Sequence, residues 1–145
     1  RELVGTNCIT VRLPSLYGER RRMRTNIGLL ERLLIKLKGD EDVTINPEIY
    51  DSPTYAAEVA RYIFEVVYKG VSLPSVLHLS CSGVCSLLEF CEKAKDIVNS
   101  KSRIEVMEDK NLEAIDCRAL QQTSISGTYS IPSWDISLKS YLEKK

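Results

Sequence analysis

The chain has 145 residues, of which 43% are hydrophobic and 28% charged, as is typical of a single globular domain. Its 20 Lys and Arg residues balance 20 Asp and Glu residues, so no basic excess points to nucleic acid or a membrane surface as a partner. The apolar stretches are much shorter than the ~20 residues that cross a bilayer, and the N-terminal residues show no signal-peptide pattern, so we expect a cytoplasmic protein.

The first two elements are a strand and a helix. Residues 8–13 are apolar and β-branched, which predicts a short, largely buried strand that ends in a loop. Residues 25–38 carry apolar side chains at spacings of three and four, which predicts an amphipathic helix. We expect Thr25 or Asn26 to cap this helix and Gly39 to end it in the left-handed conformation.

A second strand and helix follow. Residues 43–45 read as a short strand. Ser52 and Pro53 have the residue types of an N-cap and a first helical position, so we predict a helix that begins there and closes at Gly70. Its expected buried face consists of Ala56, Val59, Ala60, Ile63, Phe64 and Val67.

The third strand–helix pair covers residues 76–99. Residues 76–80 predict a strand, and a turn of small residues follows it. Ser86 and Glu89 form a capping-box pattern, which predicts a helix that runs to about Asn99.

The last part of the chain has weaker patterns. Residues 103–107 alternate like a half-exposed strand, and residues 109–128 read as mostly irregular. A final short helix is predicted after Pro132, with an apolar face of Ile136, Leu138, Tyr141 and Leu142. The alternation of strands and helices predicts an α/β fold. The strands are short and the loops long, which argues against a complete sheet within this chain.

The cysteines do not suggest a metal centre. The five of them form an odd set without secretory context, which favours reduced thiols: Cys8, Cys81, Cys85, Cys91 and Cys117. Their spacing is not that of a structural zinc site, and the one histidine, His78, lies in a predicted strand. We therefore predict no metal site.

Several segments resemble extended short-chain dehydrogenases, and dTDP-4-dehydrorhamnose reductases in particular. Residues 11–18 (VRLPSLYG) are similar to a late strand and loop of that superfamily, and residues 49–56 (IYDSPTYA) to a strand-to-helix loop of the reductases. Residues 78–90 (HLSCSGVCSLLEF) are similar to the next strand, turn and capped helix. These segments follow the family's order and cover most of the chain.

The resemblance implies the C-terminal portion of a Rossmann-fold enzyme together with its smaller substrate-binding lobe. Residues 1–18 would be the last strand and loop of the cofactor domain, and residues 19–145 the lobe. NADP or NAD would be bound mainly by an N-terminal half that precedes these segments, because the seven glycines do not form a glycine-rich cofactor turn. The family's catalytic Tyr-x-x-x-Lys pair would also lie upstream, since the string Tyr141 to Lys145 follows no cofactor strand. We predict no catalytic residue in this chain and expect it to be inactive alone.

Four residues carry the predicted site. By resemblance, Pro14 and Tyr17 would border the cofactor, and Ser15 and Tyr17 the sugar. Arg118 resembles a late arginine that can face nucleotide phosphates through its guanidinium. The plainer alternatives are a Tyr17 packed in the core and an exposed Arg118.

The expected function is therefore the substrate-binding part of an NAD(P)-dependent nucleotide-sugar reductase, whose parent could assemble as a homodimer. Two alternatives stay open: an NAD-dependent nucleotide-sugar epimerase, and a non-catalytic regulatory subunit of the same fold. The Arg-Leu-Pro-Ser-Leu-Tyr-Gly string, residues 12–18, is nearer to the regulatory subunit of methionine adenosyltransferase.

Overall fold

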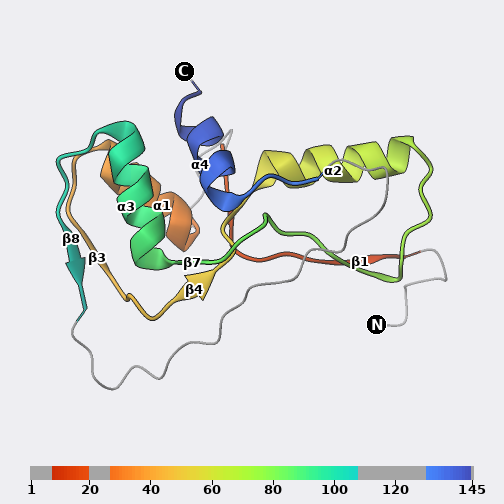
Figure 1. Ribbon diagram of the computed structural model, residues 1–145, viewed down its shortest axis with the longest axis horizontal. Coiled ribbons are helices and arrows are strands. Elements are labelled where there is room, and N and C mark those ends of the chain that lie inside the picture. Colours follow the sequence, from red (N-terminus) through yellow and green to blue (C-terminus); the bar gives the residue numbers. More distant parts are fainter. Residues whose placement is uncertain (1–7, 20–26, 108–129, 145) are drawn as a thin grey trace.

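The computed structural model describes residues 8–19, 27–107 and 130–144, which form an α/β fold (Figure 1). The elements in chain order are β1 (Thr10–Arg12), β2 (Leu16–Tyr17), α1 (Leu29–Lys38), β3 (Val43–Ile45), β4 (Tyr50–Asp51), β5 (Thr54–Tyr55), α2 (Ala56–Tyr68), β6 (Val76–His78), β7 (Cys85–Ser86), α3 (Leu87–Val98), β8 (Ile104–Val106) and α4 (Trp134–Leu142). Residues 109–128, which were predicted to be mostly irregular, lie outside the described residues.

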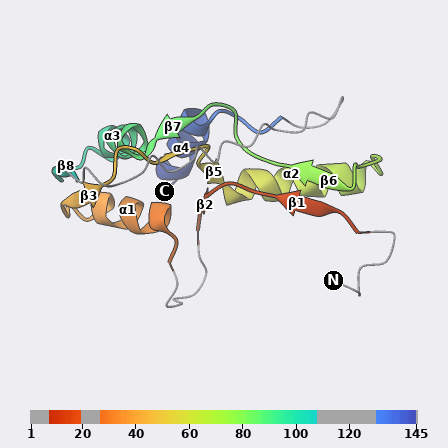
Figure 2. The same ribbon diagram turned by 90° about the horizontal axis from the view of Figure 1, so that it is seen from below.

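The strands pair two by two over the described residues. Three pairs are parallel, β1 with β6, β2 with β5 and β3 with β8, whereas β4 and β7 are antiparallel. Figure 2 shows α2 lying along β1 and β6, away from the other three helices. No helix in the described ranges is both long and apolar enough to span a membrane.

The buried side chains form two clusters. The larger joins α1, α3 and α4 with residues of β2, β3 and β5, and it includes Leu34, Phe90 and Leu138. The smaller places α2 against β6 and Ile131. Trp134 packs against both clusters and so connects the two ends of the molecule.

Helix α1 ends differently from the expectation. Gly39 has a φ of −92°, and the left-handed residue is Asp40 with a φ of 57°. The N–H of Glu41 donates to Lys36 O and that of Asp40 to Leu37 O, a bonding pattern that uses the last free carbonyls of the helix. The prediction for Gly39 is wrong by one position. The helix begins at Leu29, and the predicted caps Thr25 and Asn26 lie outside the described residues.

The predicted start of α2 at Ser52 is also wrong. Thr54 and Tyr55 pair with β2 as strand β5, so the helix begins only at Ala56. The Ser52 hydroxyl, expected to cap the helix, instead donates to Gly83 O at 2.9 Å. Long-range pairing therefore overrides the local capping signal. The predicted end is confirmed, because Gly70, with a φ of 60°, follows the C-cap residue Lys69.

The buried face of α2 was predicted only in part, because Val59 is buried as expected but Ala60, Ile63, Phe64 and Val67 are exposed. The buried residues are Val59, Tyr62 and Val66, whereas Phe64 is 72% exposed. Apolar residues occupy most of the helix circumference, so their periodicity alone did not select the face that meets β6. Phe64 instead stacks on Tyr68 at the outer surface.

The predictions for helices α3 and α4 agree better with the structure. The Ser86–Glu89 capping box is confirmed, and Asn99 takes the left-handed conformation at the end of α3. In α4, Leu138 and Tyr141 are buried as predicted, but Ile136 is 59% exposed. The face of α4 that meets α3 runs through Trp134, Leu138 and Tyr141, at helical spacings of four and three, and Ile136 lies off it.

Candidate functional site

Three segments meet beyond the carboxyl ends of the parallel strands β1 and β6. They are the loop of residues 13–18, the segment of residues 51–55 and the turn of residues 79–83. The pairing of β2 with β5 joins the first two, and the N–H of Cys81 donates to the Thr54 hydroxyl at 2.9 Å, which joins the third. In open α/β sheets, ligands bind at this end of the strands. These segments are therefore the candidate site.

The loop that carries Pro14 and Ser15 is held by its neighbours. Ser15 N–H donates to Asp51 Oδ2 at 3.3 Å, and Ser15 O accepts from Thr54 N–H at 3.0 Å. Both Pro14 and Ser15 are partly exposed. Their side chains are thus accessible while the backbone of Ser15 is fixed.

Tyr17 lies in the core. Its side chain is 2% exposed, and its ring stacks on Tyr55 at 5.8 Å between centroids and meets Phe90 and Tyr141 edge-on. Burial is the main cause that raises the pKa of its phenol, and nearby Cys81 adds to the effect. The hydroxyl has no hydrogen-bond partner among the described residues. Core packing accounts for this side chain, and its contact with a ligand stays a prediction.

Glu31 belongs to the same region but was not expected from the sequence. It lies on the buried side of α1, where Oε2 accepts from Gly18 N–H at 3.1 Å and Oε1 accepts from the Tyr141 hydroxyl at 3.3 Å. Burial and this carboxylate raise the pKa of Tyr141 to about 12. Its packing and this hydrogen bond give Tyr141 a structural role.

The buried cysteines are poor nucleophiles. Burial raises the pKa of Cys81 to about 11 and that of Cys91 to about 12, and it also raises the pKa of Cys85. Since the thiolate is the reactive form, these thiols are inert at neutral pH. No group of three or more metal-ligating side chains occurs within the described part of the chain.

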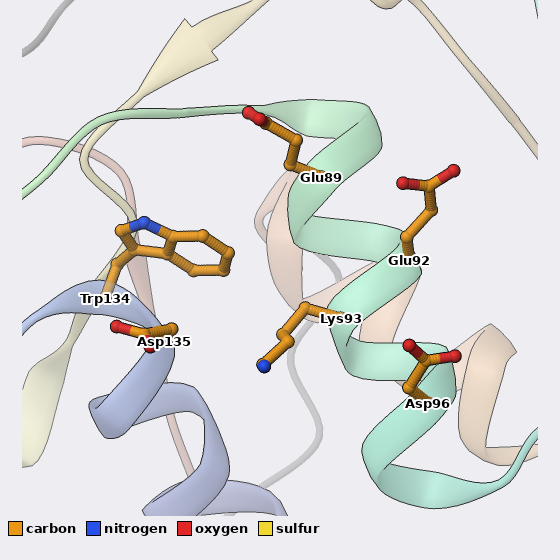
Figure 3. A pocket seen from close by; sticks show the side chains of 6 residues that line it. All are labelled: Glu89, Glu92, Lys93, Asp96, Trp134 and Asp135. Atoms are coloured by element: carbon orange, nitrogen blue, oxygen red, sulfur yellow. The ribbon is translucent and has the colours of Figure 1, made fainter.

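A groove of about 530 Å³ lies elsewhere, between α3 and α4 (Figure 3). Four carboxylates and one ammonium group line it beside an indole ring: Glu89, Glu92, Asp96, Asp135, Lys93 and Trp134. A diphosphate would be repelled by this excess of negative charge. The groove is therefore not suited to a nucleotide sugar.

Arg118 lies outside the described residues. The described residues also do not fit a dinucleotide cofactor by themselves, because Gly18 and Gly83 stand singly and neither starts a glycine-rich turn into a helix.

Comparison with solved structures shows the same fold in nucleotide-sugar enzymes. The dTDP-4-dehydrorhamnose reductase from Bacillus anthracis str. Ames, solved in complex with NADP, is 22% identical and has a TM-score of 0.71, over 90% of this chain and 46% of the reductase. A dTDP-4-dehydrorhamnose reductase ortholog from Clostridium acetobutylicum is 18% identical with a TM-score of 0.69, over 92% and 47%. The UDP-glucose 4-epimerase from Thermotoga maritima, solved with UDP-glucose, is 15% identical with a TM-score of 0.71, over 92% and 44%.

The present chain thus spans less than half the length of these enzymes. The match confirms the α/β fold class that was predicted from the sequence. No curated protein matches it. The family model described as the RmlD substrate binding domain matches residues 2–144. The predicted resemblance is therefore confirmed, and the chain belongs to the RmlD substrate binding domain family.

Proposed function

We propose that this chain is the substrate-binding half of an NAD(P)-dependent nucleotide-sugar reductase and has no activity alone. Family membership supports the substrate-binding role. The loop at the end of β1 supplies Ser15 and Tyr17 for the sugar nucleotide and Pro14 and Tyr17 for the cofactor. Arg118, the third residue proposed for the sugar nucleotide, lies outside the described residues.

The observation that carries this proposal is the open edge of β1. Thr10 N–H donates to Ser75 O, toward β6, so the N–H of Val11 points to the opposite edge. The described part of the chain places no strand at that edge. Val11 is 37% exposed, and Ile9 and Leu13 are exposed to a similar extent. Parallel sheets are normally buried on both faces, and an isolated strand pair is marginally stable.

A further part of the protein would complete this sheet and hold the cofactor. The solved relatives support this idea, because more than half of each lies beyond the match. When bound there, NADP or NAD would supply the hydride chemistry. The residues of the present chain would orient the sugar nucleotide and exclude water. We place the protein in the cytoplasm, which its free buried thiols support.

Epimerisation is the second candidate reaction. The Thermotoga maritima epimerase matches with the same TM-score as the Bacillus anthracis reductase, so the fold itself does not separate the two reactions.

Calorimetric titration of the full-length protein with dTDP-, UDP- and GDP-sugars tests the proposal. We expect one nucleotide class to bind in the presence of NADPH and a matching 4-keto sugar to oxidise NADPH. Interconversion of the C4 epimers without net oxidation would favour the epimerase instead. If no sugar nucleotide bound, the proposed function would be wrong.

A further inference from the structure

We propose that Asp51 and Glu31 are positioning residues that clamp the two ends of the segment Ser15–Gly18, so that it meets a ligand in one fixed conformation. The inference about the clamp rests on the hydrogen bonds in this chain. Its consequence for affinity rests on the proposed function, which places this segment against the sugar nucleotide.

The first end is held by Asp51, whose side chain is 9% exposed. Its Oδ2 accepts the N–H of Ser15 at 3.3 Å, and its Oδ1 accepts the N–H of Ser52 at 2.8 Å. The carbonyl of Ser15 is bound at the same time by Thr54 N–H. Both backbone polar groups of Ser15 are therefore used by the segment of residues 51–54.

The second end is held by Glu31, which is also 9% exposed. Its Oε2 accepts the N–H of Gly18, and its Oε1 accepts the Tyr141 hydroxyl. This carboxylate thus connects the loop to α1 and α4 at once.

The chemistry of the two carboxylates favours a positioning role. A buried carboxylate is destabilising unless hydrogen bonds or a cation compensate for its lost hydration. Neither Asp51 nor Glu31 has a salt-bridge partner within 4.0 Å among the described residues. Charge-assisted hydrogen bonds compensate for the lost hydration of the two carboxylates. Two of the four are donated by the N–H groups of Ser15 and Gly18, at the two ends of the clamped segment.

The clamp has a consequence for recognition. Because the N–H groups of Ser15 and Gly18 are bound by carboxylates, neither is available to a phosphate oxygen. Contacts from this loop must then come from its other backbone groups or from side chains such as those of Pro14 and Ser15. A loop fixed before binding also costs the ligand less ordering entropy.

The test compares Asp51→Asn and Glu31→Gln in the full-length protein with Asp42→Asn as a matched control. Asp42 also accepts a backbone N–H, that of Arg103 at 2.7 Å, but it lies by β3 and β8 and is exposed. Each variant keeps the shape of the side chain and replaces one carboxylate oxygen, an acceptor, by an amide NH2 group, a donor. We expect amide exchange at Ser15 in Asp51→Asn, and at Gly18 in Glu31→Gln, to accelerate at least tenfold, with no change in Asp42→Asn.

The same variants should weaken binding of the nucleotide sugar about tenfold, which corresponds to about 1.4 kcal/mol. Unchanged exchange at both amides would overturn the clamp. Equal weakening by Asp42→Asn would show a general structural effect and overturn the positioning role. A wild-type protein that binds no nucleotide sugar would refute the proposed function and the predicted affinity loss, while amide exchange would still decide the clamp.

If a variant fails to fold, the clamp can be tested in the wild-type protein by nuclear magnetic resonance. Scalar couplings across hydrogen bonds should connect the Ser15 amide nitrogen to the Asp51 carboxyl carbon, and the Gly18 amide nitrogen to that of Glu31. The absence of both couplings would overturn the inference.

Discussion

Two glycines take the left-handed conformation in different surroundings. Gly70 has a φ of 60° with open space where a Cβ would stand, whereas at Gly83, with a φ of 85°, a Cβ would lie 3.2 Å from Trp134 Cδ1. The turn at Gly83 also presents its carbonyl to the Ser52 hydroxyl. Gly83 therefore allows the turn of the candidate site to approach the indole that joins the two clusters.

We predict that Gly83→Ala destabilises the protein more than Gly70→Ala. Gly70→Ala should cost about 1 kcal/mol from backbone strain alone. Gly83→Ala should cost about 1 kcal/mol beyond that, because the new methyl group presses on Trp134. Urea unfolding followed by circular dichroism measures both. Equal losses in the two variants would show that the contact with Trp134 is unimportant.

The residues of the candidate site were only partly predictable. The loop of Pro14 and Ser15 was found because its sequence resembles that of a family. The contacts of Asp51 and Glu31 could not be found, because they join residues 36 and 13 positions apart through the tertiary fold. The core position of Tyr17 was only the plainer alternative to a ligand contact, because its ring partners Tyr55, Phe90 and Tyr141 are distant in the sequence.

At the scale of the elements, α3 shows how a local signal fixes a helix start. Glu89 N–H donates to the Ser86 hydroxyl at 3.1 Å, and the Glu89 carboxylate accepts the N–H of Ser86 at 2.7 Å. Helix α4 also has a serine at its N-cap, Ser133, but this side chain makes no capping hydrogen bond to the helix backbone.

Ser86→Ala should therefore lower the free energy of unfolding by about 1–2 kcal/mol, because a helix N–H loses its acceptor. Ser133→Ala is the matched control and should have a smaller effect, since its hydroxyl bonds to the Asp135 carboxylate rather than to the helix backbone. Thermal unfolding of both variants provides the measurement. A loss at Ser133 as large as that at Ser86 would contradict the capping assignment.

Local signals and tertiary pairing explain which elements were predicted correctly. The capping box of α3 lies within four residues, so the sequence alone located that helix. The start of α2 was misplaced because β5 pairs with β2, a contact between residues 38 positions apart at Leu16 and Thr54. The periodicity of apolar residues also failed to identify most of the buried face of α2, because apolar residues surround most of that helix.

At the scale of the whole molecule, the two clusters differ in how completely they are enclosed. The cluster of α1, α3 and α4 surrounds fully buried residues such as Phe90 and Leu138. The β1–β6 pair is covered by α2 but leaves the edge of β1 open (Figure 2). The fold class was predictable from the alternation of strands and helices. The pairing of β1 with β6 was not, because it joins segments more than 60 residues apart.

The most direct test of the proposed half-enzyme is amide hydrogen exchange at Val11 and Thr10, measured in this chain alone and in the full-length protein. If a cofactor-holding sheet continues beyond β1, Val11 should exchange rapidly in the chain alone and become protected in the full-length protein, while Thr10 is already bonded to Ser75 O in both. Equal exchange of Val11 in the two proteins would mean that no strand pairs at this edge and would contradict the account.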